Sequence, residues 1–175
     1  MATERIEPDT KDWTWVLTAP CPECGFHADA AAGPDVADLV RGYVPRWEAV
    51  LARADVGVRP APQVWSPLEY ACHVRDAFTV FAGRVRLMLD QDVPTFENWD
   101  QDATAEAQRY GEQDPALVAA GLRDAGADVA AVFDAVPAEA WSRRGLRSNG
   151  SEFTVESLGQ YFVHDVVHHL HDVRG

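Results

Sequence analysis

Four stretches of the chain repeat apolar residues three and four positions apart, which is typical of amphipathic helices. The first stretch opens at Pro34 and continues to about Leu51. Its stripe consists of Val36, Leu39, Val40, Tyr43, Val44, Trp47, Val50 and Leu51. Residues 56–64 then hold prolines and a glycine without a helical period, which predicts a connection.

The second stretch carries a clear helix start. Ser66 suits the N-cap, Pro67 suits the first helical position, and Glu69 stands three residues after the serine. This order predicts a capping box, in which serine and glutamate each satisfy a backbone N–H of the first turn. Apolar positions then recur to about Asp90, so we expect a helix of that length.

Residues 94–114 are polar and aromatic without a sustained period, and they predict a long, partly ordered loop. The third helix is expected from about Pro115 to Val136, with Asp114 as its cap, and the last from a Thr154 cap to about Arg174. Any strand should be short and near the Asn149-Gly150 turn, at residues 148–153.

These elements predict an all-α fold, a four-helix bundle with an irregular N-terminal segment and a long loop between helices two and three. The 175 residues are interpreted as one domain. Within it, residues 1–33 form the irregular segment and residues 34–175 the helical bundle.

Charge narrows the range of partners. The chain has 15 basic and 28 acidic residues, a net charge of −13, whereas nucleic-acid binding needs a basic surface. No apolar run reaches the ~20 residues of a membrane helix, and no basic-then-apolar signal pattern opens the chain. We therefore expect a cytoplasmic protein with a small-molecule substrate, without nucleic-acid or membrane binding. Bundles of this kind often dimerise, so a homodimer is possible.

Histidines supply the candidate chemistry. His164 and His168 are four residues apart on the last helix, so both imidazoles can reach one metal ion. His73 is the one histidine in another predicted helix and is the candidate third ligand. The competing interpretation is a solvated face, because the His164 stripe lies opposite the apolar arc. That stripe, however, lacks Lys, Arg and Glu, which is unusual for the surface of so charged a protein.

The sequence WSPLEYACHVRD at residues 65–76, paired with HDVVHH at 164–169, resembles the DinB/YfiT-like superfamily. That group includes the N-terminal domain of mycothiol-dependent maleylpyruvate isomerase. The resemblance covers essentially the whole chain, including NWDQD at residues 98–102. It implies a four-helix bundle with one divalent ion held by His73, His164 and His168.

The resemblance also implies an activity. Three neutral nitrogen ligands leave a coordination position open, as in catalytic zinc sites. The characterised relatives are mostly thiol transferases, so the expected function is a metal-dependent, mycothiol-type S-transferase or isomerase that activates a thiol or water. A low-molecular-weight thiol is the implied cosubstrate. Zinc is the first candidate ion, and nickel, copper and iron also accept imidazole ligands. The alternatives are a non-catalytic metal- or ligand-binding stress-response module and a vestigial site.

Cys21-Pro22-Glu23-Cys24-Gly25 is a second distinctive motif and resembles half of a zinc ribbon. Three interpretations remain open: a second metal site completed by His27 or by a residue from the bundle, a redox-active dithiol, or a turn with two unremarkable thiols. Of the remaining candidates, His169 is expected in packing or at the surface, and His171 is a reserve ligand.

Overall fold

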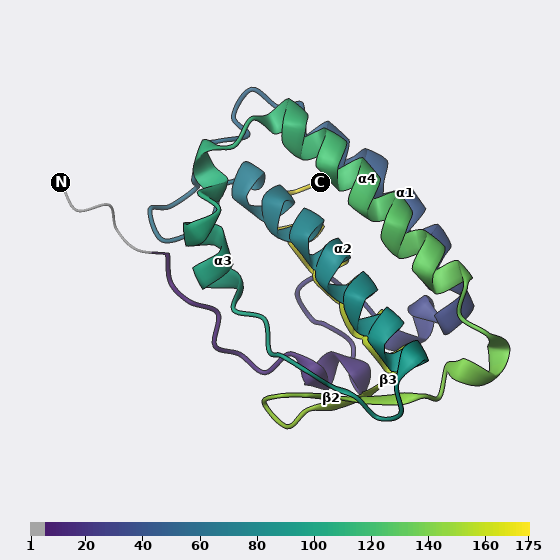
Figure 1. The fold of residues 1–175 in the computed structure, drawn as a ribbon. Helices are drawn as coiled ribbons and strands as arrows, with labels where there is room; N and C mark the ends of the chain where they lie inside the picture. The colour runs from purple at the N-terminus through teal and green to yellow at the C-terminus, as the bar shows by residue number, and fades with distance from the viewer. Residues whose placement is uncertain (1–5) are drawn as a thin grey trace.

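The computed structural model describes residues 6–175 and contains a bundle of four long helices (Figure 1). The bundle helices are α1 (Val36–Leu51), α2 (Pro67–Asp90), α4 (Pro115–Asp134) and α5 (Val155–Asp172). Helix α4 packs against α1 and α2, and α5, drawn in yellow behind α2, also packs against α1 and α2. The predicted four-helix bundle is therefore confirmed.

The helix starts follow from the capping residues that the sequence analysis identified. The Ser66 side chain accepts a hydrogen bond from the Glu69 N–H, and the Glu69 carboxylate accepts one from the Ser66 N–H at 2.8 Å. Asp114 caps α4 through the N–H groups of Ala116 and Leu117, and Thr154 caps α5. Each cap satisfies backbone donors that lack a partner within the helix.

Aromatic rings fill the centre of the bundle. Phe162 on α5 is fully buried and lies against Phe78 and Phe81 of α2 and Phe133 of α4, with ring centroids 4.9–5.9 Å apart. Large buried rings contribute strongly to core stability through their area and their packing geometry. This cluster holds α5 in one rotation about its axis, which decides the direction in which its polar residues point.

A small sheet departs from the strictly all-α class that the sequence analysis expected. Strands β1 (Thr95–Phe96), β2 (Arg144–Arg147) and β3 (Glu152–Thr154) are hydrogen-bonded in the order β1-β2-β3. The β2–β3 pair is antiparallel, with its turn at Asn149-Gly150 near the predicted position, whereas β1 runs parallel to β2. A strand as short as β1 has no alternation for sequence analysis to detect. The expected loop also holds a short helix, α3 (Gln101–Ala107).

The N-terminal segment covers the face of α5 that points away from the bundle core. It contains the 3-10 turns η1 (Thr14–Leu17) and η2 (Ala28–Ala31), both packed on α5, and a third, η3 (Gly33–Asp35), leads into α1. Val16 and Ala31 are fully buried there, and Phe26 is 7% exposed. This cover explains why the His164 stripe lacks long charged residues. Across residues 6–175, no helix has the length and apolar character to cross a membrane.

Candidate metal centres

Helix α5 presents metal-ligand side chains on two adjacent faces. One face carries His164 and His168, and the next carries Asp165 and His169. Because consecutive helical residues are about 100° apart, the two faces meet different parts of the molecule. Asp165 and His169 meet His73 of α2, whereas His164 and His168 meet the N-terminal segment.

The structure therefore divides the three histidines expected to form one triad. His73 lies with Asp165 and His169, named here the His2Asp group, and His164 and His168 lie with Cys21 and Cys24, named here the Cys2His2 group. Within each group the ligand atoms lie within 4.8 Å of one another. Among residues 6–175, His73, His164 and His168 do not form a group of their own.

The Asp165 carboxylate joins the two imidazoles of the His2Asp group. Its Oδ2 lies 3.2 Å from His73 Nε2, and its Oδ1 lies 3.4 Å from His169 Nε2. His169 Nδ1 lies 2.9 Å from an oxygen of Asp172, which fixes the orientation of that ring. His73 Nδ1 is buried and has no hydrogen-bond partner among the described residues.

The charges of this group are strongly coupled. Burial lowers the pKa of His169, but the carboxylates of Asp165 and Asp172 outweigh it and raise that pKa to about 9. Burial raises the pKa of Asp165, but His73 and His169 hold it well below its usual range. Without a metal, the group therefore contains an ion pair between His169 and the two carboxylates at neutral pH.

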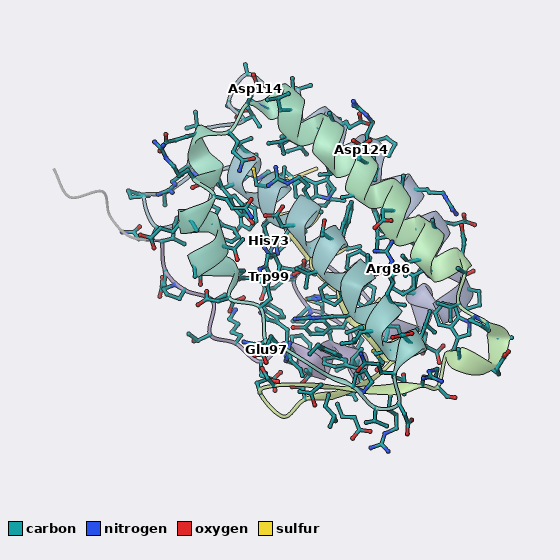
Figure 2. The ribbon with its side chains drawn as sticks, in the orientation of Figure 1. His73, Arg86, Glu97, Trp99, Asp114 and Asp124 are labelled. Atoms are coloured by element: carbon teal, nitrogen blue, oxygen red, sulfur yellow. The ribbon has the colours of Figure 1, made fainter. Side chains whose placement is uncertain are left out.

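Aromatic side chains hold the two imidazoles in place. Trp99 stacks on His73 with a centroid distance of 5.1 Å and an interplanar angle of 7°, and Figure 2 shows the pair beside α3. Trp65 lies 5.5 Å from the His73 ring, and Tyr70 lies 4.9 Å from His169. Trp99 donates to Thr104 Oγ1 at 2.8 Å, which anchors the loop over His73. One loop aromatic thus lies directly over the candidate site.

The His2Asp group lies at the edge of a cleft of about 1020 Å³. Asp165 and His169 line this cleft, while His73 is 1% exposed beneath Trp99. Residues 6–13 also line this cleft, and the Lys and Arg residues among its lining are Lys11 and Arg147. Asp102 also lines it, and burial together with Asp100 and Asp9 raises the pKa of Asp102. A small molecule in this cleft could reach the group.

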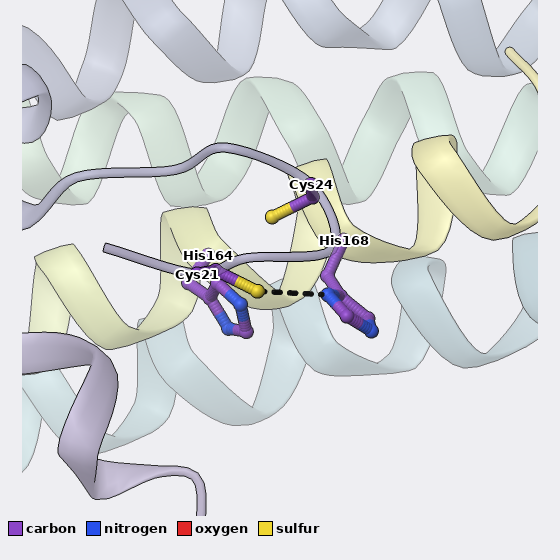
Figure 3. A group of neighbouring side chains, drawn as sticks. All are labelled: Cys21, Cys24, His164 and His168. Atoms are coloured by element: carbon purple, nitrogen blue, oxygen red, sulfur yellow. Dashed lines mark hydrogen bonds between the residues drawn. The ribbon is translucent and has the colours of Figure 1, made fainter. Parts of the chain in front are cut away.

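The Cys2His2 group joins the N-terminal segment to α5, as Figure 3 shows. Cys21 Sγ lies 3.6 Å from His168 Nδ1, and His164 Nε2 is buried without a hydrogen-bond partner in the described chain. Burial lowers the pKa of both histidines, that of His164 to about 4. Burial, with Cys21 beside it, raises the pKa of Cys24 to about 11.

A tight turn aims the two cysteines in one direction. The Gly25 N–H donates to the Cys21 carbonyl at 2.8 Å, and the Cys21 N–H donates to the Phe26 carbonyl at 2.9 Å. Gly25 has a φ of +75°, a conformation that glycine adopts without strain.

The other candidate residues lie apart from both groups. His27 is exposed and lies at the start of η2, so the structure does not assemble Cys21 and Cys24 with His27. His171 is exposed. His169, expected in packing or at the surface, lies instead beside His73 because its face of α5 points toward α2.

Two sequence signals could have identified the observed groups. Asp165 and His169 have the same four-residue spacing as His164 and His168, and the same reasoning applies to both pairs. A C-x2-C motif with an H-x3-H motif is a known zinc-ligand combination, although here far more chain separates them than in a zinc finger.

Comparisons with known proteins identify the bundle. The sequence profile of the DinB superfamily matches residues 38–173. No curated protein matches the sequence. Among solved structures, YfiT from Bacillus subtilis matches with a TM-score of 0.67 and 18% identity, over 88% of this chain and 86% of that one. YfiT is described as a probable metal-dependent hydrolase with an unusual four-helix bundle topology. At that identity, the likeness concerns the fold.

Proposed function

This chain belongs to the DinB superfamily, and on that premise we propose that it is a metal-dependent enzyme that transfers a low-molecular-weight thiol to an electrophilic small molecule. His73, Asp165 and His169 hold the divalent ion in this proposal. The observation that carries it is the convergence of these three side chains from α2 and α5 at the edge of a large cleft.

The donor set suits a catalytic metal. Two imidazoles and one carboxylate leave coordination positions open, as in hydrolytic zinc sites and non-haem iron sites. His73 turns Nε2 toward the Asp165 carboxylate, so this nitrogen is the one that would bind an ion shared with Asp165 and His169. A divalent ion held by His73, Asp165 and His169 would supply Lewis acidity, which would lower the pKa of a thiol or water nucleophile beside it.

The surrounding residues have separate roles. Asp172 orients His169. Trp99 and Trp65 pack against the His73 ring, so they exclude water from it and hold it in one rotamer. Asp102 lines the cleft with a raised pKa, so its carboxylate can accept the proton that the thiol gives up.

The cleft itself favours a thiol transferase over a simple hydrolase. Its volume of about 1020 Å³ accommodates a thiol cosubstrate and an electrophile together. Arg147, held by Asn149 at 2.9 Å and Ser151 at 3.1 Å, offers a fixed cation for a carboxylate on either molecule. A thiol of the mycothiol type, which is polar and carries many hydroxyl groups, fits this lining. The ion that we expect is zinc.

The test compares metal content and thiol consumption. Wild-type protein loaded with Zn²⁺ is incubated with a panel of low-molecular-weight thiols and a bimane electrophile, and ester hydrolysis is measured in parallel. His169→Ala should lower thiol transfer by more than about 100-fold, since even outer partners of metal ligands contribute 10–100-fold. His171→Ala, two residues further along α5 and exposed, is the matched control and should retain the rate.

The outcomes separate the alternatives. Ester hydrolysis without thiol consumption would assign water as the nucleophile, and the absence of both reactions would favour a non-catalytic binding module. Full metal content and activity in His169→Ala, with loss of both in His164→Ala, would restore the triad of His73, His164 and His168.

A further inference from the structure

We propose that Cys21, Cys24, His164 and His168 form a second metal site, a structural zinc site that fastens the N-terminal segment to α5. The His2Asp group uses none of these side chains. The site differs in kind from the proposed catalytic centre, because its four protein ligands fill a tetrahedral shell and leave no position for substrate.

The distances agree with such a site. Zinc bonds of about 2.3 Å to sulfur and about 2.1 Å to nitrogen place two tetrahedral ligand atoms about 3.6 Å apart. Cys21 Sγ and His168 Nδ1 are 3.6 Å apart, and all four ligand atoms lie within 4.8 Å of one another. The turn at Gly25 and the four-residue spacing on α5 direct each pair of ligands toward the same point.

An unsatisfied buried nitrogen is independent evidence for a ligand. His164 is 3% exposed, and its Nε2 has no hydrogen-bond partner within residues 6–175. A buried polar atom without a partner costs about 1–3 kcal/mol, and coordination to a metal removes that cost. The rings of Trp13 and Phe26 pack against His164 at 5.4 Å and cover part of the site, whose two histidines also line the cleft.

Neighbouring carboxylates support the tautomer that ligation requires. His168 Nε2 lies 3.8 Å from an oxygen of Glu23 and 3.9 Å from one of Asp172. These carboxylates stabilise a proton on His168 Nε2. In that tautomer Nδ1, which faces Cys21, carries the lone pair that binds the metal. Glu23 lies between the two cysteines in sequence, so the same turn supplies both sulfurs and this carboxylate.

The charge balance of the site is complete. Zn²⁺ replaces the thiol protons of Cys21 and Cys24, releasing two protons to solvent, and the two histidines bind in their neutral form. Two thiolates and one divalent ion leave no net charge in this largely buried position. Cys21, Cys24 and Cys72 are free thiols in the structure, so no oxidation step is involved.

The experiment uses the full chain, stripped of metal with chelator under reducing conditions and titrated with Co²⁺ and then Zn²⁺. A thiolate ligand gives Co²⁺ a strong near-ultraviolet charge-transfer band, which the His2Asp group cannot produce. We expect this band in the wild type and in His169→Ala, together with two bound zinc equivalents in the wild type and one in His169→Ala. Cys24→Ser leaves Cys21 as the one thiolate of the site, so the charge-transfer band should fall to half its intensity or less, and the variant should bind one zinc equivalent less than the wild type. Cys24 is only partly buried, so this variant should fold.

Two further variants test the ligand set. His164→Ala should lose the tetrahedral visible bands of Co²⁺, whereas His27→Ala, which changes an exposed histidine three residues after Cys24, should keep the full spectrum. Absence of the charge-transfer band in reduced wild type would overturn the proposal, as would an unchanged spectrum in Cys24→Ser. Loss of thiol transfer in His169→Ala with the band retained would separate this site from the catalytic one.

Discussion

Asp165 gives the sharpest test of the electrostatics at the His2Asp group. Its two oxygens lie 3.2 Å from His73 Nε2 and 3.4 Å from His169 Nε2, so one carboxylate serves both rings. Asp165→Asn removes the negative charge and keeps the size and shape of the side chain. The comparison is made on metal-free protein, in which only the chain's own groups set the charge balance.

The size of the effect follows from the pKa of His169. Burial lowers this pKa, yet Asp165 and Asp172 raise it to about 9 from a usual value of 6.5. Each pKa unit corresponds to about 1.4 kcal/mol, so the shift represents on the order of 3 kcal/mol of folding stability. The His169 side chain is 15% exposed, so solvent screens the interaction little.

The sign of the pH dependence is set by the direction of that shift. Because the folded-state pKa of His169 lies above its unfolded value, its contribution is complete below a pH of about 6.5 and is lost as the pH rises through about 9. The lowered pKa of Asp165 describes the same interaction from the acid side, where stability is lost as the pH falls through its folded-state pKa. The two shifts are therefore not added.

Urea unfolding near pH 6 and near pH 9.5, with chelator and reductant, measures the effect. The free energy of unfolding of the wild type should exceed that of Asp165→Asn by about 2–3 kcal/mol more near pH 6 than near pH 9.5. Because the two proteins are compared at the same pH, the titration of groups that both contain cancels. NMR titration should show the pKa of His169 falling toward 6.5 in the variant. Asp128→Asn, at a half-exposed carboxylate paired with Arg86, is the control and should cost less than about 1 kcal/mol.

The reasoning would be refuted if wild type and Asp165→Asn differed in free energy of unfolding by the same amount near pH 6 and near pH 9.5. So would a wild-type His169 that titrates near 6.5, because the Asp165 and Asp172 carboxylates would then not outweigh burial.

Three further substitutions test the fold that positions the site, each by urea unfolding. Phe162→Ala should lower the free energy of unfolding by about 3–5 kcal/mol, because the ring is fully buried among aromatic side chains, whereas Leu117→Ala, at a residue 73% exposed, should change it little. Ser66→Ala should cost about 1 kcal/mol by removing the N-cap of α2. Gly33→Ala should cost about 1–3 kcal/mol, since the new methyl group would lie 2.4 Å from a ring atom of Trp141.

Much of the bundle could be predicted from local sequence signals. The Ser66, Asp114 and Thr154 caps act within a few residues of themselves, so the sequence alone indicates where α2, α4 and α5 begin. Strand β1 could not be predicted, because its pairing with β2 depends on residues about fifty positions away and not on any local pattern.

The metal ligands show a similar limit. Sequence spacing places His164 and His168 on one face of a helix, but it does not say which segment that face meets. The Phe162 cluster and the N-terminal cover determine the rotation of α5, and both depend on tertiary packing. Adjacent positions on α5 point about 100° apart, so His164 lies beside Cys21 whereas Asp165, the next residue, lies beside His73.

The position of the N-terminal segment has a consequence for how the chain folds. Residues 13–31 pack on α5, the last helix, so these contacts join nearly the two ends of the sequence. Contacts of such high sequence separation carry a large loop-closure entropy and tend to form late. On the ribosome, the segment emerges before α5 and has no surface to bind until α5 has been made. We therefore expect the bundle to assemble before its N-terminal cover, with the hydrophobic side chains of Val16 and Phe26 exposed until then.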